Sequence, residues 1–448
     1  MPLFFARDAL LPDGWARDVR IEVDVSGNFS SIQKNSTPEG AEQLPGPVLP
    51  GMANLHSHAF QRAMAGLAEV RGAGGTDADD DFWSWRELMY RFVQRLTPER
   101  AQAVARFLYI DMLKHGYTAV GEFHYVHDGA AAMLDAHLEA SKAAGIAVTL
   151  LPSVYRWANF GRRPLQERQQ RFDSDPVFVL DLVKSVNTTP DIRVGVSPHS
   201  LRAVDPGSLK ELISGLKKID PEAPIHIHAA EQTKEVDDCL AALGKRPVEW
   251  LLENMNLDAR WCLVHATHMT PEETTALAKS GATAGLCPTT EANLGDGIFP
   301  LPAYRASGGR YGIGGDSHVS RNPAEELRLL EYAQRLVARR RNRVASETSP
   351  AVGTALWLEA ADGARALGRK MGAIAPGLRA DLVVLDAENA DISGRAGDAI
   401  ANALIFSGGT GMVRDVMVGG AWAVREGSHP YDEAAKTSYK KAVSDLLS

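Results

Sequence analysis

The sequence predicts an α/β protein: a (β/α)₈ barrel (TIM barrel) with a smaller β domain built from both chain ends. Three observations support this fold class. Short apolar runs that end in polar residues recur eight times along the middle of the 448-residue chain, and helix-compatible segments separate them. The two chain ends instead show β-type patterns with glycine-containing turns. Strands and helices in regular alternation are typical of a parallel sheet that is covered by helices.

The eight apolar runs are the candidate barrel strands. They lack the polar alternation of half-exposed strands, as expected of strands buried on both faces of a parallel sheet. In chain order they span residues 48–58, 117–125, 146–155, 192–199, 223–231, 260–268, 282–288 and 310–318. The third and seventh runs also fit parts of helices, so these two assignments have an alternative.

The segments between the runs carry helix signals. Around residues 98–115, Thr97 can cap the first turn, Pro98 can occupy it and Gly116 can end the helix. A second helix is predicted to begin at Asn322, which a proline follows. Such helices are the expected cover of the barrel.

The β-type patterns at the chain ends predict strands that pair with one another. These patterns span residues 18–32, 380–389 and 413–424. We therefore expect a composite β domain of residues 1–49 plus 370–448, beside a barrel of residues 50–369. Two independent appendages are the alternative.

The composition, with 45% hydrophobic and 23% charged residues, is that of a folded globular protein. A net charge of −8 disfavours nucleic acid and anionic membranes as partners. The start of the chain lacks the features of a signal peptide, and no run reaches the ~20 apolar residues of a membrane-spanning helix. The three cysteines are too scattered for a disulfide framework, so we expect them to be small buried residues of a cytoplasmic protein.

Histidines at the ends of the predicted strands indicate a metal site. The first run ends in His56 and His58, which project to the same side because strand side chains alternate between faces. This pair is only half a site. His228, His265 and Asp316 each end another run, and the strand ends of a barrel converge on one face.

Three histidines and a carboxylate suit a borderline divalent ion such as Zn²⁺. Such an ion lowers the pKa of a bound water toward about 7 and so supplies a nucleophile at neutral pH. The sequence therefore predicts a metal-dependent hydrolase.

The run that contains His228 also contains His226, so either histidine can be the ligand. We select His228 because Glu231 follows three residues later, where a loop can turn a carboxylate back over the metal ion. A carboxyl group there can move a proton from the attacking water to a leaving nitrogen. His226 is then expected to be a packed histidine, and His318, two residues after Asp316, is expected behind the ligands.

Five motifs carry a resemblance to a known family, and they are PGMANLHSHAFQRAMAG, HIHAAEQ, LVHATH, GGDSH and GLRADLVVLD. Together they resemble the amidohydrolase superfamily, in its subgroup of aminohydrolases and deaminases with one metal ion. The resemblance spans nearly the whole chain. It implies a distorted (β/α)₈ barrel with a small β-sandwich from both chain ends, and a homodimer. The fourth run ends in Ser197, Pro198 and His199 without the lysine that binuclear members need, which implies one divalent ion, with Zn²⁺ as the first candidate.

Further segments are similar to the members of that superfamily that hydrolyse N-formimino-L-glutamate to N-formyl-L-glutamate and ammonia in bacterial histidine degradation. They include HSHAFQRAMAGLAEVRG, GEFHYVHD, SPHSLRAV, CPTTEANLGDGIFP and GGDSHVSRNP. Carried over by position, the resemblance implies three groups of site residues. These are the metal ligands His56, His58, His228 and Asp316, the catalytic residues Glu231, His265 and Asp316, and the substrate contacts Gln61, Arg86, Tyr125, His199 and Arg202.

The two arginines fit such a substrate, because planar cationic donors can grip its carboxylates in pairs. Arg202 follows the fourth strand, at the expected active face. Arg86 is expected in the long loop after the first strand, between Trp83 and Trp85, whose rings either cover the site or simply pack. An ordinary solvated residue on an exposed helix is the alternative for Arg86.

The expected mechanism gives each catalytic residue a role. Asp316 takes a proton from the attacking water, His265 orients or polarises the reacting groups, and Glu231 delivers a proton to the departing nitrogen. Alternative functions are the hydrolytic deamination of a purine or pyrimidine base, as in guanine deaminases, and the deimination of N-formimino-L-aspartate. A barrel without activity, used as a binding module, is a third.

Overall fold

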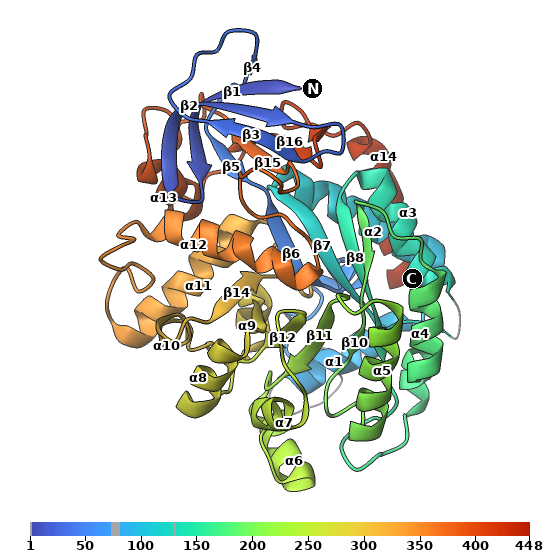
Figure 1. Cartoon of the computed structure of the whole chain (residues 1–448). Coiled ribbons are helices and arrows are strands. Elements are labelled where there is room, and N and C mark those ends of the chain that lie inside the picture. Colours follow the sequence, from blue (N-terminus) through green and yellow to red (C-terminus); the bar gives the residue numbers. More distant parts are fainter. Residues whose placement is uncertain (1, 73–80, 129–130) are drawn as a thin grey trace.

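The computed structural model describes residues 2–72, 81–128 and 131–448, and these residues form two sheets and the helices around them (Figure 1). The central sheet is parallel, and each of the eight predicted runs contributes to it, the third and seventh included. The fourth run is split into two short strands. In chain order the strands are β6 (Met52–Ser57), β7 (Tyr117–His124), β8 (Ala147–Val154), β9 (Ile192–Val194), β10 (Ser197–Pro198), β11 (Ile225–Ala229), β12 (Trp261–His265), β13 (Thr283–Leu286) and β14 (Arg310–Ile313).

The central sheet closes on itself. Its hydrogen-bonded order is β10-β8-β7-β6-β14-β13-β12-β11, so β10 and β11 stand at its two ends. The Val196 amide donates to the Pro224 carbonyl at 3.0 Å, and the His228 amide donates to the His199 carbonyl at 3.1 Å. Gly195 allows this approach, because a Cβ there would lie 2.2 Å from the Pro224 oxygen. The barrel is therefore confirmed, and it is distorted where the fourth strand breaks.

Helices surround the barrel (Figure 1), and many of them begin with a proline behind a capping side chain. Thr97 caps the predicted helix α2, and Asn322 caps α11 by accepting from the Ala324 amide at 2.9 Å. The helices are α1 (Phe82–Val93), α2 (Pro98–Lys114), α3 (Ala132–Ala144), α4 (Pro176–Ser185), α5 (Pro206–Ile219), α6 (Thr233–Leu243), α7 (Pro247–Asn254), α8 (Pro271–Ser280), α9 (Pro288–Leu294), α10 (Leu301–Ala306), α11 (Pro323–Ala338), α12 (Val352–Asp362), α13 (Asp398–Phe406) and α14 (Asp432–Leu447), with 3₁₀ turns η1 (Ala59–Met64), η2 (Glu167–Phe172) and η3 (Gly363–Leu367).

The second sheet joins the two chain ends, so the alternative of two independent appendages is wrong. Strand β5 pairs with β15, and Leu49 stands opposite Val383. The order is β17-β16-β15-β5-β1-β2-β3, with β4 on β1. These strands are β1 (Leu3–Leu11), β2 (Gly14–Val23), β3 (Phe29–Gln33), β4 (Glu42–Gln43), β5 (Val48–Pro50), β15 (Leu382–Leu385), β16 (Val413–Val418) and β17 (Ala421–Val424).

Apolar side chains from both ends of the chain, such as Phe29 and Met417, share one buried cluster in this second sheet. The C-terminal helix α14 instead lies on the barrel helix α2, where the rings of Phe107 and Tyr439 stack at 4.2 Å. The domain boundaries at residues 49–50 and 369–370 stay a prediction.

The three cysteines are buried and unpaired, as the sequence analysis predicts. Every helix in the described part of the chain is too short or too polar to cross a lipid bilayer.

Candidate active site

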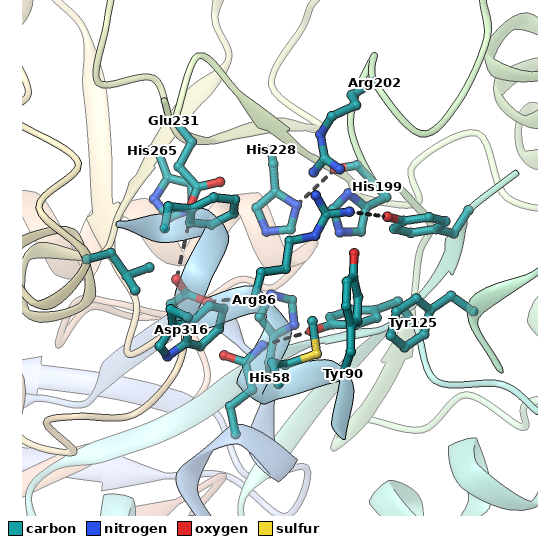
Figure 2. A pocket seen from close by; sticks show the side chains of 17 residues that line it. His58, Arg86, Tyr90, Tyr125, His199, Arg202, His228, Glu231, His265 and Asp316 are labelled. Carbon is teal, nitrogen blue, oxygen red and sulfur yellow. Dashed lines mark hydrogen bonds and ion pairs between the residues drawn. The ribbon is translucent and has the colours of Figure 1, made fainter. Parts of the chain in front are cut away.

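One pocket at the carboxyl ends of the barrel strands contains the predicted site residues (Figure 2). Figure 2 shows Glu231, His265 and Asp316 together on one side of the pocket, and Arg202, His199 and Tyr125 on the other. Every residue predicted to act in the site lines this pocket except His56, which is fully buried directly beneath it.

The four predicted metal ligands lie together. The Nε2 atoms of His56 and His228 are 3.1 Å apart, although 172 positions separate the two residues in the chain. The Nε2 atoms of His56 and His58 lie 3.5 Å and 3.4 Å from Asp316 Oδ1. The rings of His56 and His58 have centroids 4.6 Å apart, so both histidines do project to the same side.

The hydrogen bonds of these histidines fit a divalent metal ion. His58 donates from Nδ1 to the Phe123 carbonyl at 2.8 Å, and His228 donates from Nδ1 to the His199 carbonyl at 2.9 Å. Each Nε2 is therefore a lone-pair donor aimed into the cluster. Burial lowers the pKa of His56, His58 and His228, which keeps them neutral, as metal ligands must be. His228 Nε2 thus places a lone pair 3.1 Å from His56 Nε2, close enough for both nitrogens to share one cation.

Histidine 226 does not join this cluster. Its Nε2 donates to the Ala366 carbonyl at 2.7 Å, and its side chain is fully buried. Burial also lowers the pKa of His226, to about 4, so it packs as a neutral residue. The structure thus places His228, not His226, among the candidate ligands.

Two residues of the site have a strained backbone. His265 and Asp316 are left-handed, with φ of 66° and 48°, a conformation that non-glycine residues adopt rarely. Asp316 is held by its neighbours, because its amide donates to the His56 carbonyl at 2.9 Å and its carbonyl accepts from the His58 amide at 3.0 Å. These two bonds fix the carboxylate against both histidines of the first strand.

The imidazole of His265 lies among three carboxylates. Its Nδ1 donates to Glu291 Oε1 at 3.2 Å, while its Nε2 lies 3.7 Å from Glu231 and 3.9 Å from Asp316. Burial opposes a charge on the ring, but the carboxylates outweigh it and raise the pKa of His265 to about 10. Burial raises the pKa of Glu231 to about 7, although His265 opposes that shift. A carboxyl group with such a pKa can both hold and release a proton near neutrality.

Two arginines form the opposite wall. Arg86 donates from Nη2 to the Tyr155 hydroxyl at 2.9 Å, and the buried Nη1 of Arg202 has no hydrogen-bond partner. No described carboxylate forms an ion pair with either guanidinium. Burial alone would raise the pKa of Tyr155, but Arg86 and Arg202 outweigh it and lower that pKa. A cationic wall of one buried and one partly buried arginine, without its own anions, is suited to an anionic ligand.

The prediction that Arg86 lies in a loop is wrong, because it lies on helix α1. Asp81 caps this helix by accepting from the backbone amides of Trp83 and Ser84. Trp83 lies against both arginines, with its ring centroid 5.4 Å from the Arg86 guanidinium and 5.8 Å from that of Arg202. Trp85 lines the pocket itself.

The remaining predicted contacts connect the two walls. Gln61 donates from Nε2 to the Tyr125 hydroxyl at 2.8 Å, and its own Oε1 is buried without a partner. The His199 ring stands 4.7 Å from the rings of both Tyr155 and His228. His199 therefore lies between the arginines and the histidine cluster.

Several residues of the site were not predicted from the sequence. Glu122 lies on the second barrel strand, two residues before its end, and it accepts from the Ser57 hydroxyl at 2.6 Å. His318 lies behind the ligands as expected, with Nε2 2.8 Å from the Ser57 hydroxyl. Tyr155 ends the third predicted run and so carried the strand-end signal, whereas Glu291 carried no signal that distinguished it from an ordinary residue.

Comparisons with known proteins agree with this geometry. A family model described as "Amidohydrolase family" matches residues 48–423, and one described as "Formimidoylglutamate deiminase HutF, N-terminal domain" matches residues 1–46. A formimidoylglutamate deiminase of Pseudomonas aeruginosa is 50% identical over 100% of both chains. A 5-methylthioadenosine/S-adenosylhomocysteine deaminase of Natronomonas pharaonis is 30% identical over 76% of this chain and 73% of its own.

Solved structures are similar as well. The crystal structure of an amidohydrolase from Brucella melitensis matches with a TM-score of 0.92 and 45% identity over 100% of both chains. A zinc-bound adenosine deaminase from Xanthomonas campestris shares the fold, with a TM-score of 0.81 and 19% identity over 99% of this chain and 98% of its own. With a family model that covers most of its length and a relative that matches it from end to end, the chain belongs to the amidohydrolase family.

Proposed function

We propose that the protein hydrolyses the formimino group of N-formimino-L-glutamate and releases N-formyl-L-glutamate and ammonia, a step of histidine degradation. The observation that carries this proposal is a single pocket in which a histidine and aspartate cluster faces two arginines, the buried Arg202 and the partly buried Arg86, neither of which has a described carboxylate partner. The relative that is 50% identical along the whole chain bears the name of this activity, which supports the same conclusion.

His56, His58, His228 and Asp316 would hold one divalent metal ion, with Zn²⁺ as the first candidate. Three neutral imidazoles and one carboxylate form the donor set that zinc prefers, and a structural neighbour contains zinc. When bound, the ion would supply Lewis-acid chemistry that activates water at neutral pH.

Three residues of this chain move or direct protons in the proposed reaction. Asp316 accepts a proton from the water that attacks the formimino carbon. Glu231 delivers a proton to the nitrogen that leaves as ammonia, while the carbon keeps the oxygen of the water and becomes a formyl group. His265, held beside both carboxylates, orients and polarises the reacting groups.

The arginine wall would bind the carboxylates of the substrate. Guanidinium groups offer paired donors at the spacing of carboxylate oxygens, and burial strengthens these bonds. Gln61, Tyr125 and His199 lie between that wall and the cluster, so they are placed to contact the middle of the substrate. A neutral purine or pyrimidine base would leave both arginines without a partner.

Steady-state assays test the proposal directly. The metal-loaded protein is incubated with N-formimino-L-glutamate, N-formimino-L-aspartate, guanine, cytosine and adenosine, and ammonia release is measured for each. We expect the highest kcat/KM with N-formimino-L-glutamate, and N-formyl-L-glutamate as the carbon-containing product. Faster turnover of a base, or turnover of none of these compounds, would contradict the proposed substrate. Absence of bound metal from protein purified without added zinc would favour a binding module.

We also propose that the protein works in the cytoplasm as a homodimer on a small-molecule substrate, without nucleic acid or membrane partners. The negative net charge and the three unpaired, buried cysteines support this proposal. Light scattering after size-exclusion chromatography tests the dimer, and a monomer at micromolar concentration would contradict it.

A further inference from the structure

Glu291 is a buried carboxylate that touches the site from behind. It belongs to the first turn of α9, and its side chain is only 4% exposed. One oxygen, Oε1, accepts two hydrogen bonds: from the Cys287 amide at 2.8 Å and from His265 Nδ1 at 3.2 Å. Because the backbone donor holds this oxygen in place, the position of the carboxylate does not depend on His265.

The segment that carries Glu291 is also fixed relative to Asp316. Thr290, the preceding residue, donates from its hydroxyl to the Gly315 carbonyl at 3.0 Å. The Thr289 amide donates to Glu326 on α11 at 2.9 Å. The start of α9 therefore spans the space between the end of β12, which bears His265, and the loop after β14, which bears Asp316.

The hydrogen bond between His265 and Glu291 determines the orientation of the His265 ring. Since Nδ1 donates to Glu291, Nε2 has to face Glu231 and Asp316. His265 and the next residue, Ala266, are both left-handed, and Glu291 is the carboxylate that bonds Nδ1 of the ring.

We propose that Glu291 is a positioning residue for the reaction: its carboxylate holds the His265 ring with Nδ1 turned away and Nε2 presented to Glu231, Asp316 and the substrate. This inference rests on the proposed function, in which His265 polarises the reacting groups. Glu291 itself does not line the pocket and touches no reacting atom.

The Glu291→Gln substitution tests whether the reaction needs the negative charge of the Glu291 carboxylate. The glutamine keeps an Oε1 that can accept from both the Cys287 amide and His265, so shape and hydrogen bonds are preserved. We expect kcat to fall about 10- to 100-fold, the range found for groups that orient another residue of a metal site. KM should stay within about twofold of the parent value, and the bound metal should be unchanged. Glu331→Gln is the matched control, because this buried glutamate of α11 accepts from Arg335 and from the Arg343 and Val344 amides and touches neither His265 nor the start of α9, and it should keep the parent kcat.

A double-mutant cycle tests whether Glu291 acts through His265. In the His265→Ala background, Glu291→Gln should cause no further loss of kcat, because the residue that it positions is absent. A loss as large in that background as in the parent would overturn the proposal, as would a parent-like kcat in the Glu291→Gln variant. The cycle is measured with whichever substrate the parent turns over, so a wrong substrate assignment is recognised separately.

A structural readout keeps the test independent of activity. Crystal structures of the metal-loaded parent and of Glu291→Ala would show the ring of His265 directly. We expect the ring to rotate, or to occupy more than one orientation, once the carboxylate is removed. An unchanged ring in Glu291→Ala would overturn the positioning role whatever the enzyme hydrolyses.

Discussion

The two walls of the pocket are held in different ways. The strand-end wall, made of His56, His58, His228, His265 and Asp316, is fixed by backbone hydrogen bonds between neighbouring strands. The arginine wall, made of Arg86, Arg202 and Tyr155, depends on a separate helix, on the loop after β10 and on side-chain contacts. The barrel thus fixes the groups for chemistry, while the segments attached to it choose the substrate.

The largest effect is expected on the strand-end wall, from His228→Ala. Loss of one imidazole should remove the metal ion and reduce activity to the assay background, because the remaining donors leave the ion underligated. Metal analysis and ammonia release are measured on the same preparation. His226→Gln is the control, since the amide can still donate to the Ala366 carbonyl, and it should retain both metal and activity. The reverse result for the two variants would assign the ligand to His226.

A loss of about 10²- to 10⁴-fold in kcat is expected from Glu231→Gln, the usual contribution of a positioned acid or base. The metal content should stay at the parent level, because Glu231 is not among the proposed ligands. This variant separates proton transfer from metal binding within the same wall. Near-normal turnover of the Glu231→Gln variant would contradict the role of Glu231 as the proton donor.

On the arginine wall, Arg202→Met should act mainly on KM. A hydrogen bond to a charged group contributes about 1.5 to 3 kcal/mol, so KM for the diacid should rise about 10- to 100-fold. The value of kcat should change much less. Arg156→Met, a change in an arginine whose ion pair with Asp173 is partly exposed, is the control and should leave KM unchanged. A loss of kcat as large as the gain of KM would contradict the assignment of chemistry to one wall and substrate binding to the other.

The smallest effect concerns how the Arg202 loop is anchored. Asp205 caps α5 and accepts from Trp157 Nε1 at 2.9 Å, so Asp205→Asn should lower the free energy of unfolding by about 1 kcal/mol at pH 7. Burial opposes the charge of Asp205, but these hydrogen bonds lower its pKa from 3.8 to about 2. A lowered pKa stabilises the folded state above pH 4, and the difference from the variant should fade as pH falls through about 2. Denaturant unfolding at several pH values measures this, and a difference that does not depend on pH would exclude the charge as its source.

Much of the fold could be predicted from the sequence, because each barrel strand is a short apolar run that ends in a polar residue. The third and seventh runs were ambiguous by periodicity and are strands, since the barrel requires a parallel neighbour on each side. Arg86 was expected in a loop and lies on α1, because the cap at Asp81 starts a helix whose apolar residues pack beneath the pocket.

The sequence by itself determined the strand-end wall. Alternation of side chains along a strand aligns His56 with His58, and convergence of parallel strands brings in His228, His265 and Asp316. Only the tertiary structure decided what stands opposite and behind these groups: the pairing of Arg86 with Tyr155, and of Glu291 with His265. Those contacts join side chains from separate elements, and their distances depend on how whole helices and loops pack, which no local pattern records.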